Sequence, residues 1–144
     1  MKVHRVSRKP AVSVPPAATV REALEAMTKE EVGAVVVVEN DKAVGMFTRR
    51  DAIERVVLPK LPPESTRVST VMTSPVEVLS MDTELSDALK LMAARPFNHI
   101  PIVDSDSKVV GIATTKPIMK QTIEKLSDEL GSLEAYITAD GIGG

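Results

Sequence analysis

The stretch Gly45-Met46-Phe47-Thr48-Arg49-Arg50-Asp51 decides how the rest of the chain is interpreted, because the sequence contains it twice. The second, imperfect copy is Gly111-Ile112-Ala113-Thr114-Thr115-Lys116-Pro117. Each copy runs from an apolar segment of strand-like composition, through a threonine, into a segment of helix-like composition. At the last position an acid in the first copy is replaced by proline in the second. This agreement and this difference are the basis of the predicted function.

The repetition extends over most of the chain. When Pro10 is placed on Pro75, the apolar positions that follow coincide, and residues 35–38 fall on residues 100–103. One added residue in the second loop then brings Thr48 onto Thr114. Each copy makes up about half of the chain, so the repeat is a pair and not a solenoid. The sequence therefore predicts two similar halves with a pseudo-twofold relation.

The first half is predicted to have the order β-α-β-β-α. Strands are expected over 11–14, 34–38 and 43–47, and helices over 19–29 and 50–58, the second with Ile53, Val56 and Val57 inward. Thr19 and Glu22 fit a capping box at the start of the first helix. The unbroken apolar run 34–38 indicates a strand covered on both faces. Residues 1–9 are expected to be a flexible or loosely docked lead-in.

The second half is predicted to repeat this scheme. Strands are expected over 76–79, 99–103 and 109–113, with a helix capped by Asp82 or Thr83 between the first two. The last helix is expected over about 115–130, with Met119, Ile123, Leu126 and Leu130 on one side and Gly131 as its C′ residue.

The domain organisation follows from these elements. We expect the first repeat with its lead-in at 1–58, a stiff proline-rich linker at 59–66, the second repeat at 67–131 and a tail at 132–144. Within the tail, residues 132–139 could add a short helix, and residues 141–144 are expected to be disordered.

Composition excludes several classes of function. The chain has 144 residues, no cysteine and a formal charge of −2, so a thiolate site is excluded and a general attraction to nucleic acid is not expected. Its two histidines, His4 and His99, are far apart in sequence, and no metal site is predicted. There is no apolar run of membrane-spanning length and no signal-peptide pattern. The expectation is a cytoplasmic protein that contacts neither membrane nor nucleic acid.

At this point the pattern resembles a tandem pair of CBS domains, the regulatory module named after cystathionine β-synthase. The β-α-β-β-α order of each half and the Gly-hydrophobic-x-Thr-x-x-Asp stretch carry the resemblance, together with 71–75 and 98–104. It covers essentially residues 1–130. It implies an α/β fold of two CBS repeats packed with pseudo-twofold symmetry, forming a disc with two clefts between the halves.

The resemblance also implies a function. Members of the family commonly bind AMP, ADP or ATP in the clefts, sometimes S-adenosylmethionine, and two discs often pair into a homodimer. We therefore expect a regulatory, non-catalytic module that senses an adenine nucleotide and signals to a partner protein. The alternatives are a scaffold or dimerisation module without a physiological nucleotide and a sensor of S-adenosylmethionine. The sequence shows no nucleophile–base pair that would indicate an enzyme.

Thr48 and Asp51 are the strongest candidates for ligand contact. A carboxylate accepts two hydrogen bonds and could hold both ribose hydroxyls, while a helix N-terminus suits a phosphate. The same two residues also fit a capping box, which is a purely structural role. The resemblance favours nucleotide contact. Pro117 removes the equivalent acid, so we expect two unequal sites.

The remaining candidates come from the resemblance, which places the segment before each half's first strand in the cleft of the other half. Thr73, Ser74 and Val76 would then face Asp51, and Val12 and Ser13 would face Thr114. The first site is predicted to comprise Gly33, Ala34, Thr48, Arg49, Asp51, Thr73, Ser74, Val76, His99, Ile100 and Pro101. The second, weaker site is predicted to comprise Val12, Ser13, Thr114, Thr115 and Lys116.

Overall fold

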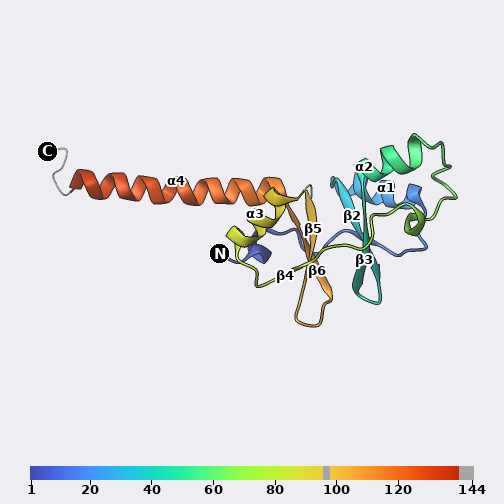
Figure 1. Cartoon of the computed structure of the whole chain (residues 1–144), viewed down its shortest axis with the longest axis horizontal. Coiled ribbons are helices and arrows are strands. Elements are labelled where there is room, and N and C mark those ends of the chain that lie inside the picture. The colour runs from blue at the N-terminus through green and yellow to red at the C-terminus, as the bar shows by residue number, and fades with distance from the viewer. Residues whose placement is uncertain (96–97, 140–144) are drawn as a thin grey trace.

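The computed structural model describes residues 1–95 and 98–139, and it has the α/β fold of two similar halves that the repeat predicts (Figure 1). The first half contains the 3-10 helix η1 (Val3–Val6), β1 (Ser13–Val14), α1 (Val20–Lys29), β2 (Ala34–Glu39), β3 (Lys42–Thr48), α2 (Arg49–Asp51) and its π-helical continuation η2 (Ala52–Val57). The second contains the 3-10 helix η3 (Val68–Thr70), β4 (Leu79–Ser80), α3 (Leu85–Ala94), β5 (His99–Val103), β6 (Val109–Thr114) and α4 (Thr115–Ala139).

The two halves carry sheets of the same topology. In each three-stranded sheet the first strand pairs in parallel with the second, and the second pairs antiparallel with the third, in the orders β1-β2-β3 and β4-β5-β6. The β2–β3 hairpin turns at Asn40 and Asp41, both with positive φ. Two residues with positive φ are what a tight hairpin turn requires. The two strands expected over 34–38 and 43–47 are therefore joined by a tight hairpin.

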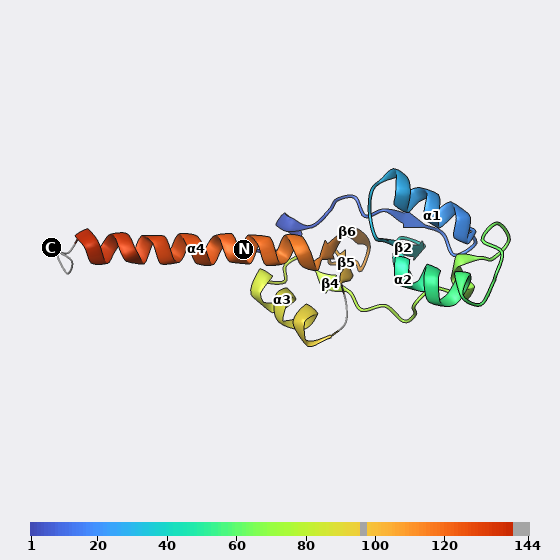
Figure 2. The same ribbon diagram turned by 90° about the horizontal axis from the view of Figure 1, so that it is seen from above.

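The sheets lie side by side in the middle of the molecule, with helices on their outer faces (Figures 1 and 2). Along β2, Val35 and Val37 belong to the core beneath the helices of the first half. Ala34 and Val36 point the other way, into a layer shared with Ile112 of β6. The expected covering of both faces is thus confirmed, and the second cover is the other sheet.

The lead segments of the halves are exchanged. Val3 is fully buried in the core of the second half, where its N–H donates to the carbonyl of Thr83 at 2.8 Å. Arg8 then pairs with Ile112 of β6, and in the same way Thr73 pairs with Met46 of β3. The expectation of a loosely docked lead-in is wrong, because this short segment supplies a core side chain and a backbone bridge to the other half.

The first helix confirms its predicted cap, whereas two other helices differ from expectation. Thr19 and Glu22 form the capping box at α1. The N-cap of α3 is Glu84, without a side-chain cap bond, in place of Asp82 or Thr83. In η2, Val56 is buried as expected, whereas Ile53 and Val57 are exposed. The second inward residue is Ala52, one turn before Val56.

Two other predicted boundaries also shift. The first strand of each half is only two residues long, at 13–14 and 79–80. The expected linker, residues 59–66, is docked on the first half. The carbonyls of Pro63 and Thr66 accept hydrogen bonds from the first N–H groups of α1 at 3.0 and 2.8 Å. This docking satisfies helix N–H groups that would otherwise need water.

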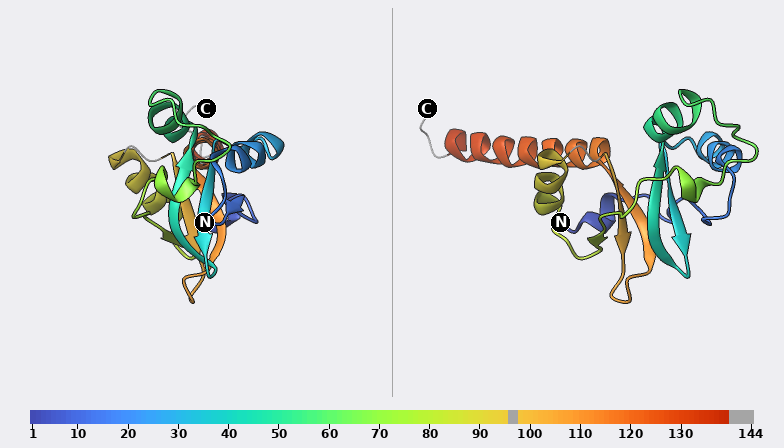
Figure 3. Two further views of the ribbon diagram at one scale, coloured as in Figure 1. Left: turned by 90° about the vertical axis from the view of Figure 1, so that its right-hand side faces the viewer. Right: turned by 45° about the vertical axis from the view of Figure 1, so that its right-hand side comes forward.

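The last helix, α4, runs well beyond its expected end. It continues without interruption through Gly131 to Ala139. Figures 2 and 3 show it projecting away from the two sheets. Gly131 is therefore not a C′ residue, and residues 132–139 are part of α4 and not a separate helix. The predicted disorder of residues 141–144 concerns positions outside the described residues. Within the described part of the chain, no helix combines the length and apolarity needed to cross a membrane.

Candidate functional site

A cavity of about 430 Å³ opens between the halves at the start of α2. The first half contributes the end of β3 and the first turns of α2 and η2, and the second half contributes its lead segment and the start of β5. A volume of this size lies in the range of small-molecule sites. The residues that line it are Gly33, Met46, Thr48, Arg49, Arg50, Asp51, Glu54, Arg55, Thr73, Pro75, Val76, Glu77, Asn98, His99 and Ile100.

Asp51 is the only buried polar or charged residue among those that the structure describes. Its Oδ2 accepts the backbone N–H of Thr48 at 3.0 Å and the Thr48 hydroxyl at 3.2 Å. Its own N–H donates to Thr48 Oγ1 at 3.2 Å, which completes the capping box. The structural role considered for this pair is therefore real.

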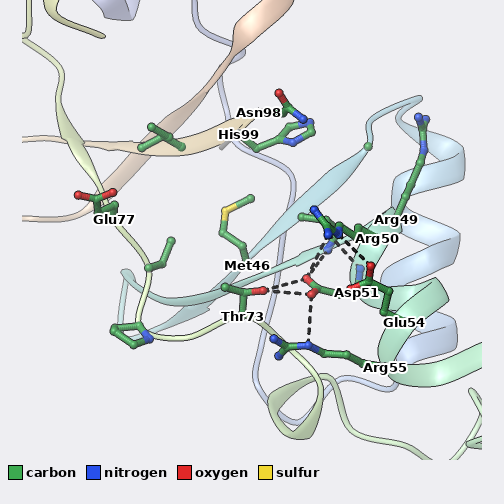
Figure 4. Close-up of a pocket in the computed structure, with 15 residues that line it drawn as sticks. Met46, Arg49, Arg50, Asp51, Glu54, Arg55, Thr73, Glu77, Asn98 and His99 are labelled. Carbon is green, nitrogen blue, oxygen red and sulfur yellow. Dashed lines mark hydrogen bonds and ion pairs between the residues drawn. The ribbon is translucent and has the colours of Figure 1, made fainter. Parts of the chain in front are cut away.

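Asp51 also joins the two halves. The hydroxyl of Thr73, from the lead segment of the second half, lies 3.0 Å from Asp51 Oδ1 and 3.3 Å from Oδ2 (Figure 4). Arg55 Nε lies 3.6 Å from Oδ1. Oδ2 accepts both bonds from Thr48, whereas Oδ1 accepts one hydrogen bond, from Thr73, and faces Arg55, so one lone pair of Oδ1 is left as an acceptor. A hydroxyl of a ligand could use this capacity without breaking the cap.

Three arginines line the same cavity as this carboxylate. Arg50 is paired with Glu54 at 3.0 Å, and Arg55 donates to the carbonyl of Met72 at 2.9 Å as well as facing Asp51. The guanidinium of Arg49 lies against Gly33, where a Cβ added to that glycine would be 3.7 Å from the central guanidinium carbon. Arg49 is thus placed to contact an anionic group at the mouth of the cavity, near the positive N-terminal end of α2.

His99 packs across the boundary of the halves. A Cβ on Gly33 would lie 3.4 Å from His99 Nε2, so the ring covers this glycine closely. Burial lowers the pKa of His99, and the neighbouring Arg49 lowers this pKa further. The ring is therefore neutral at pH 7, and it offers an apolar face with one donor and one acceptor.

Glu77 lies on the other side of the cavity from Asp51 (Figure 4). Its Oε1 is paired with Arg95 at 2.5 Å. Its Oε2 is buried and has no hydrogen-bond partner among the described residues. An unpaired buried acceptor is costly, and a donor on a ligand would satisfy it. The two ends of the cavity thus each have a carboxylate residue, Asp51 at one end and Glu77 at the other.

The structure brings together most of the residues predicted for the first site. Gly33, Thr48, Arg49, Asp51, Thr73, Val76, His99 and Ile100 line the cavity. Three others do not. Ala34 is buried between the sheets, Pro101 is fully buried, and the hydroxyl of Ser74 donates to the carbonyl of Val44. Ser74 therefore fixes the lead segment to β3 and does not face the cavity.

A second cavity, of about 1,060 Å³, adjoins the first and is more open to solvent. Gly33, Arg49, Asn98 and His99 line both. The predicted residues Thr114, Thr115 and Lys116 line the second one, together with Glu31, Met119, Lys120, Ile123 and Glu124. Val12 and Ser13 do not line it. Ser13 pairs with Val36 of β2, and the carbonyl of Val12 accepts the N–H of Val36.

The position equivalent to Thr73 is occupied by Arg8. Its N–H and carbonyl pair with Ile112 at 3.0 Å each, as those of Thr73 pair with Met46. The Arg8 guanidinium, however, turns to Glu30 at 2.9 Å. With Pro117 in place of the acid, this side has neither the carboxylate nor the hydroxyl that meet at Asp51. The two clefts are therefore chemically unequal.

The lining residues Arg55 and Glu77, and Arg8 near the second cleft, were not predicted as site residues, although the sequence indicates the place of each. Arg55 stands one helical turn after Asp51, at the spacing of an i, i+4 ion pair. Arg8 follows from the alignment of Pro10 with Pro75, which places it opposite Thr73. Glu77 falls opposite Val12, so an acid stands where the other half has an apolar residue. No group of three or more metal-ligating side chains occurs in the described ranges.

Comparison with known proteins gives a consistent result. The model of the CBS domain family matches residues 3–58 and 68–120, which are the two halves described above. An uncharacterized protein of Methanopyrus kandleri is 32% identical over 121 residues, covering 83% of this chain and 62% of that protein. The chain spans 62%, 19% and 60% of the lengths of the first curated relatives that it matches.

Two solved structures illustrate the similarity. An uncharacterized conserved protein from Pyrococcus horikoshii is 32% identical with a TM-score of 0.74, over 84% of this chain and 91% of that chain. CBSX2 of Arabidopsis thaliana in complex with AMP is 27% identical with a TM-score of 0.70, over 85% of this chain and 96% of that chain. The architecture described above is thus that of solved proteins, one of which holds AMP.

Proposed function

Because the chain belongs to the CBS domain family, we propose that it is a regulatory module that binds an adenine nucleotide in the cavity at Asp51. The observation that carries the proposal is the Asp51 carboxylate, which is buried at the boundary of the halves with acceptor capacity left on Oδ1. The AMP complex of CBSX2 supports an adenine nucleotide as the ligand. AMP, ADP and ATP are the candidates.

In the proposed complex, each part of the nucleotide meets a group suited to it. The ribose hydroxyls donate to Asp51, and the phosphate lies beside the guanidinium of Arg49, near the positive N-terminal end of α2. The base extends towards Glu77, whose buried Oε2 accepts from the exocyclic amino group of adenine. Inosine carries an oxygen at this position, so IMP should bind more weakly than AMP.

We propose that the ligand acts by changing the relation of the halves. Asp51 and Thr73 come from different halves, so a ligand held at both alters their contact. Such a ligand shifts a conformational equilibrium only by its difference in affinity for the two states. A partner protein would read the change, and the module itself is proposed to be non-catalytic. A scaffold without nucleotide and a sensor of S-adenosylmethionine remain the competing functions.

The first experiment is a thermal unfolding series with AMP, ADP, ATP, IMP and S-adenosylmethionine. A ligand that binds the native state raises the unfolding midpoint with its concentration, following RT ln(1 + [L]/Kd). The proposal expects a rise with at least one adenine nucleotide and a smaller rise with IMP. A rise with S-adenosylmethionine alone would favour that sensor, and no rise with any ligand at millimolar concentration would favour the scaffold.

The second experiment tests the site by substitution. Asp51→Asn keeps the shape of the side chain but removes its charge, and should weaken AMP binding about tenfold or more, because bonds to a charged acceptor are lost. Pro117→Ala, at the equivalent position of the other half, should leave the affinity unchanged. Titration calorimetry with AMP and 2′-deoxy-AMP measures both effects. If Asp51 holds the 2′-hydroxyl, Asp51→Asn removes the preference for AMP over 2′-deoxy-AMP; an unchanged preference refutes this contact.

A further inference from the structure

The outer part of α4 carries an apolar stripe that no other part of the described chain covers. Met119, Ile123, Leu126, Leu130, Leu133 and Ile137 are between 38% and 59% exposed. The last fully buried residue of the helix is Ile118, and every residue from 123 to 137 is exposed. An exposed apolar patch of roughly a few hundred Å² or more is uncommon on monomeric proteins and indicates an interaction surface.

The spacing of the stripe identifies the kind of cover. Its members are alternately four and three residues apart, which places them at successive d and a positions of a heptad repeat. The positions b, c and f on the opposite side are polar or small: Gln121, Glu124, Lys125, Asp128, Gly131, Ser132 and Ala135. A narrow a/d seam is typical of a two-stranded coiled coil and not of a helix that packs on a sheet.

The stripe lies almost wholly outside the part of the chain that the family relation describes. The match to the CBS domain model ends at residue 120, before Ile123. Met119 and Ile123, at the base of the stripe, border the second cavity, but no residue of the stripe lines the cavity at Asp51. From there α4 projects away from both sheets (Figures 1 and 3). The stripe is thus separate from the site at Asp51, and its role does not rest on nucleotide binding there.

The charges that flank the seam favour a second copy of this chain in antiparallel orientation. In an antiparallel pair, Met119 meets Ile137, Ile123 meets Leu133 and Leu126 meets Leu130, so all six residues are matched. On one flank of the seam, the e positions then place Lys120 opposite Glu134 twice. On the other flank, the g positions place Glu129 opposite Glu129 of the second copy. In a parallel pair, Glu129 would oppose Glu134 twice and no opposite charges would meet.

The contact area is sufficient for a dimer. Six half-exposed side chains of this size offer on the order of 600 Å² per chain, so pairing removes about 1,200 Å² from water, at the lower limit of specific interfaces. We propose that α4 pairs with α4 of a second copy as an antiparallel two-stranded coiled coil, with the six residues of the stripe in its seam. This gives a dimer held outside the ligand-binding body.

The test uses the full chain and sedimentation velocity over a range of concentrations. The wild-type chain should be a dimer. Leu130→Glu should weaken the dimer at least about a hundredfold, because the symmetric seam would bury two introduced charges. Ser132→Glu adds the same charge on the outer side of the same helix turn and should leave the dimer intact. A wild-type chain that stays monomeric at 100 micromolar, about the highest concentration that is practical, overturns the proposal.

A charge exchange tests the orientation and does not depend on how Leu130→Glu folds. Glu134→Lys places lysine opposite Lys120 in the antiparallel pair and should weaken it, whereas it would tighten a parallel pair by facing Glu129. Adding Lys120→Glu to Glu134→Lys should restore the wild-type affinity. A tighter dimer with Glu134→Lys alone, or a dimer that is insensitive to Leu130→Glu, would contradict the proposed seam.

Discussion

At the scale of single residues, two glycines let the exchanged lead segments approach the sheets. A Cβ on Gly45 would lie 3.0 Å from the carbonyl oxygen of Thr73, and a Cβ on Gly111 would lie 2.8 Å from that of Arg8. These glycines are the first residues of the two repeated stretches, 45–51 and 111–117. Their equivalent contacts show that the repeat encodes the close approach of the other half as well as a strand.

Substitution of Gly111 tests this close approach. Gly111→Ala should lower the free energy of unfolding by about 1–3 kcal/mol, since the methyl group must displace the Arg8 backbone. Gly131 is the matched control, because a Cβ there would meet nothing within 4 Å. Gly131→Ala should be neutral or slightly stabilising, as alanine is favoured over glycine inside a helix. Urea unfolding of both variants provides the measurement, and equal losses would exclude a specific contact at Gly111.

His99 should make stability depend on pH. Burial and Arg49 lower the pKa of this histidine below its ordinary value near 6.5. The unfolded chain therefore binds the proton first as pH falls, so the stabilising contribution is fully present above pH 6.5 and is lost as pH falls through the folded-state pKa. Unfolding by urea at pH 7.5 and at lower pH should show a smaller loss for His99→Gln than for the wild type. Identical pH dependence would show that His99 is not responsible.

The residues of the cavity were predictable where their chemistry is local. Thr48 and Asp51 stand out because a capping box is a pattern of four consecutive residues, and Thr73 follows once the lead segments are known to cross. Ala34, Ser74 and Pro101 could not be separated from their neighbours, because the direction of a side chain depends on which face of a strand meets the other sheet. Val12 and Ser13 were predicted to face Thr114, but Ser13 pairs with Val36 of β2 and the carbonyl of Val12 accepts the N–H of Val36. The residue that crosses to the other half as Thr73 does is Arg8.

At the scale of elements, local signals predicted the existence of helices and strands better than their ends. The capping box of α1 was predicted because both partners lie within one turn. Gly131 predicted an end for α4 that does not exist, since a glycine ends a helix only if the following chain turns back to be capped. In η2, Ile53 and Val57 match the apolar spacing of a buried face, yet this short helix packs along Ala52 and Val56.

The docked lead segment is the element least expected from the sequence. Val3→Ala should lower the free energy of unfolding by about 1–3 kcal/mol, because Val3 is fully buried in the core of the second half. Val57→Ala removes the same two methyl groups at a position that is 63% exposed and should change stability by less than about 0.5 kcal/mol. Chemical denaturation compares the two directly. A small effect of Val3→Ala would mean that the lead segment contributes little to this core.

At the scale of the whole molecule, the pseudo-twofold arrangement was predictable from the repeat, whereas the outline was not. The alignment of Pro10 with Pro75 requires two equivalent halves, and the unbroken run of β2 requires a cover on each face. Neither indicates that α4 leaves the body, because the exposure of Ile123 or Leu126 depends on the position of the other helices. The apolar spacing of residues 119–137 can be seen in the sequence. Whether these side chains are buried or exposed depends on the direction in which α4 leaves the body.

Removal of the projecting part of α4 should separate the ligand-binding body from self-association. A chain ending at Thr122 should have the same thermal unfolding midpoint as the monomeric Leu130→Glu variant within about 2 °C, because every residue from 123 to 137 is exposed. It should also bind AMP as the full chain does, while its sedimentation coefficient becomes that of a monomer. A large fall in the midpoint would indicate that α4 stabilises the body beyond Thr122.

The exchange of lead segments has a consequence for the order in which the protein is made. Val3 is synthesised well before the other members of its core, which include Leu79, Ile102 and Ile118. When the first half has been synthesised, the core of the second half, in which Val3 is buried, does not yet exist. The segment around Val3 is thus synthesised before the first sheet but buried only after the second half is complete.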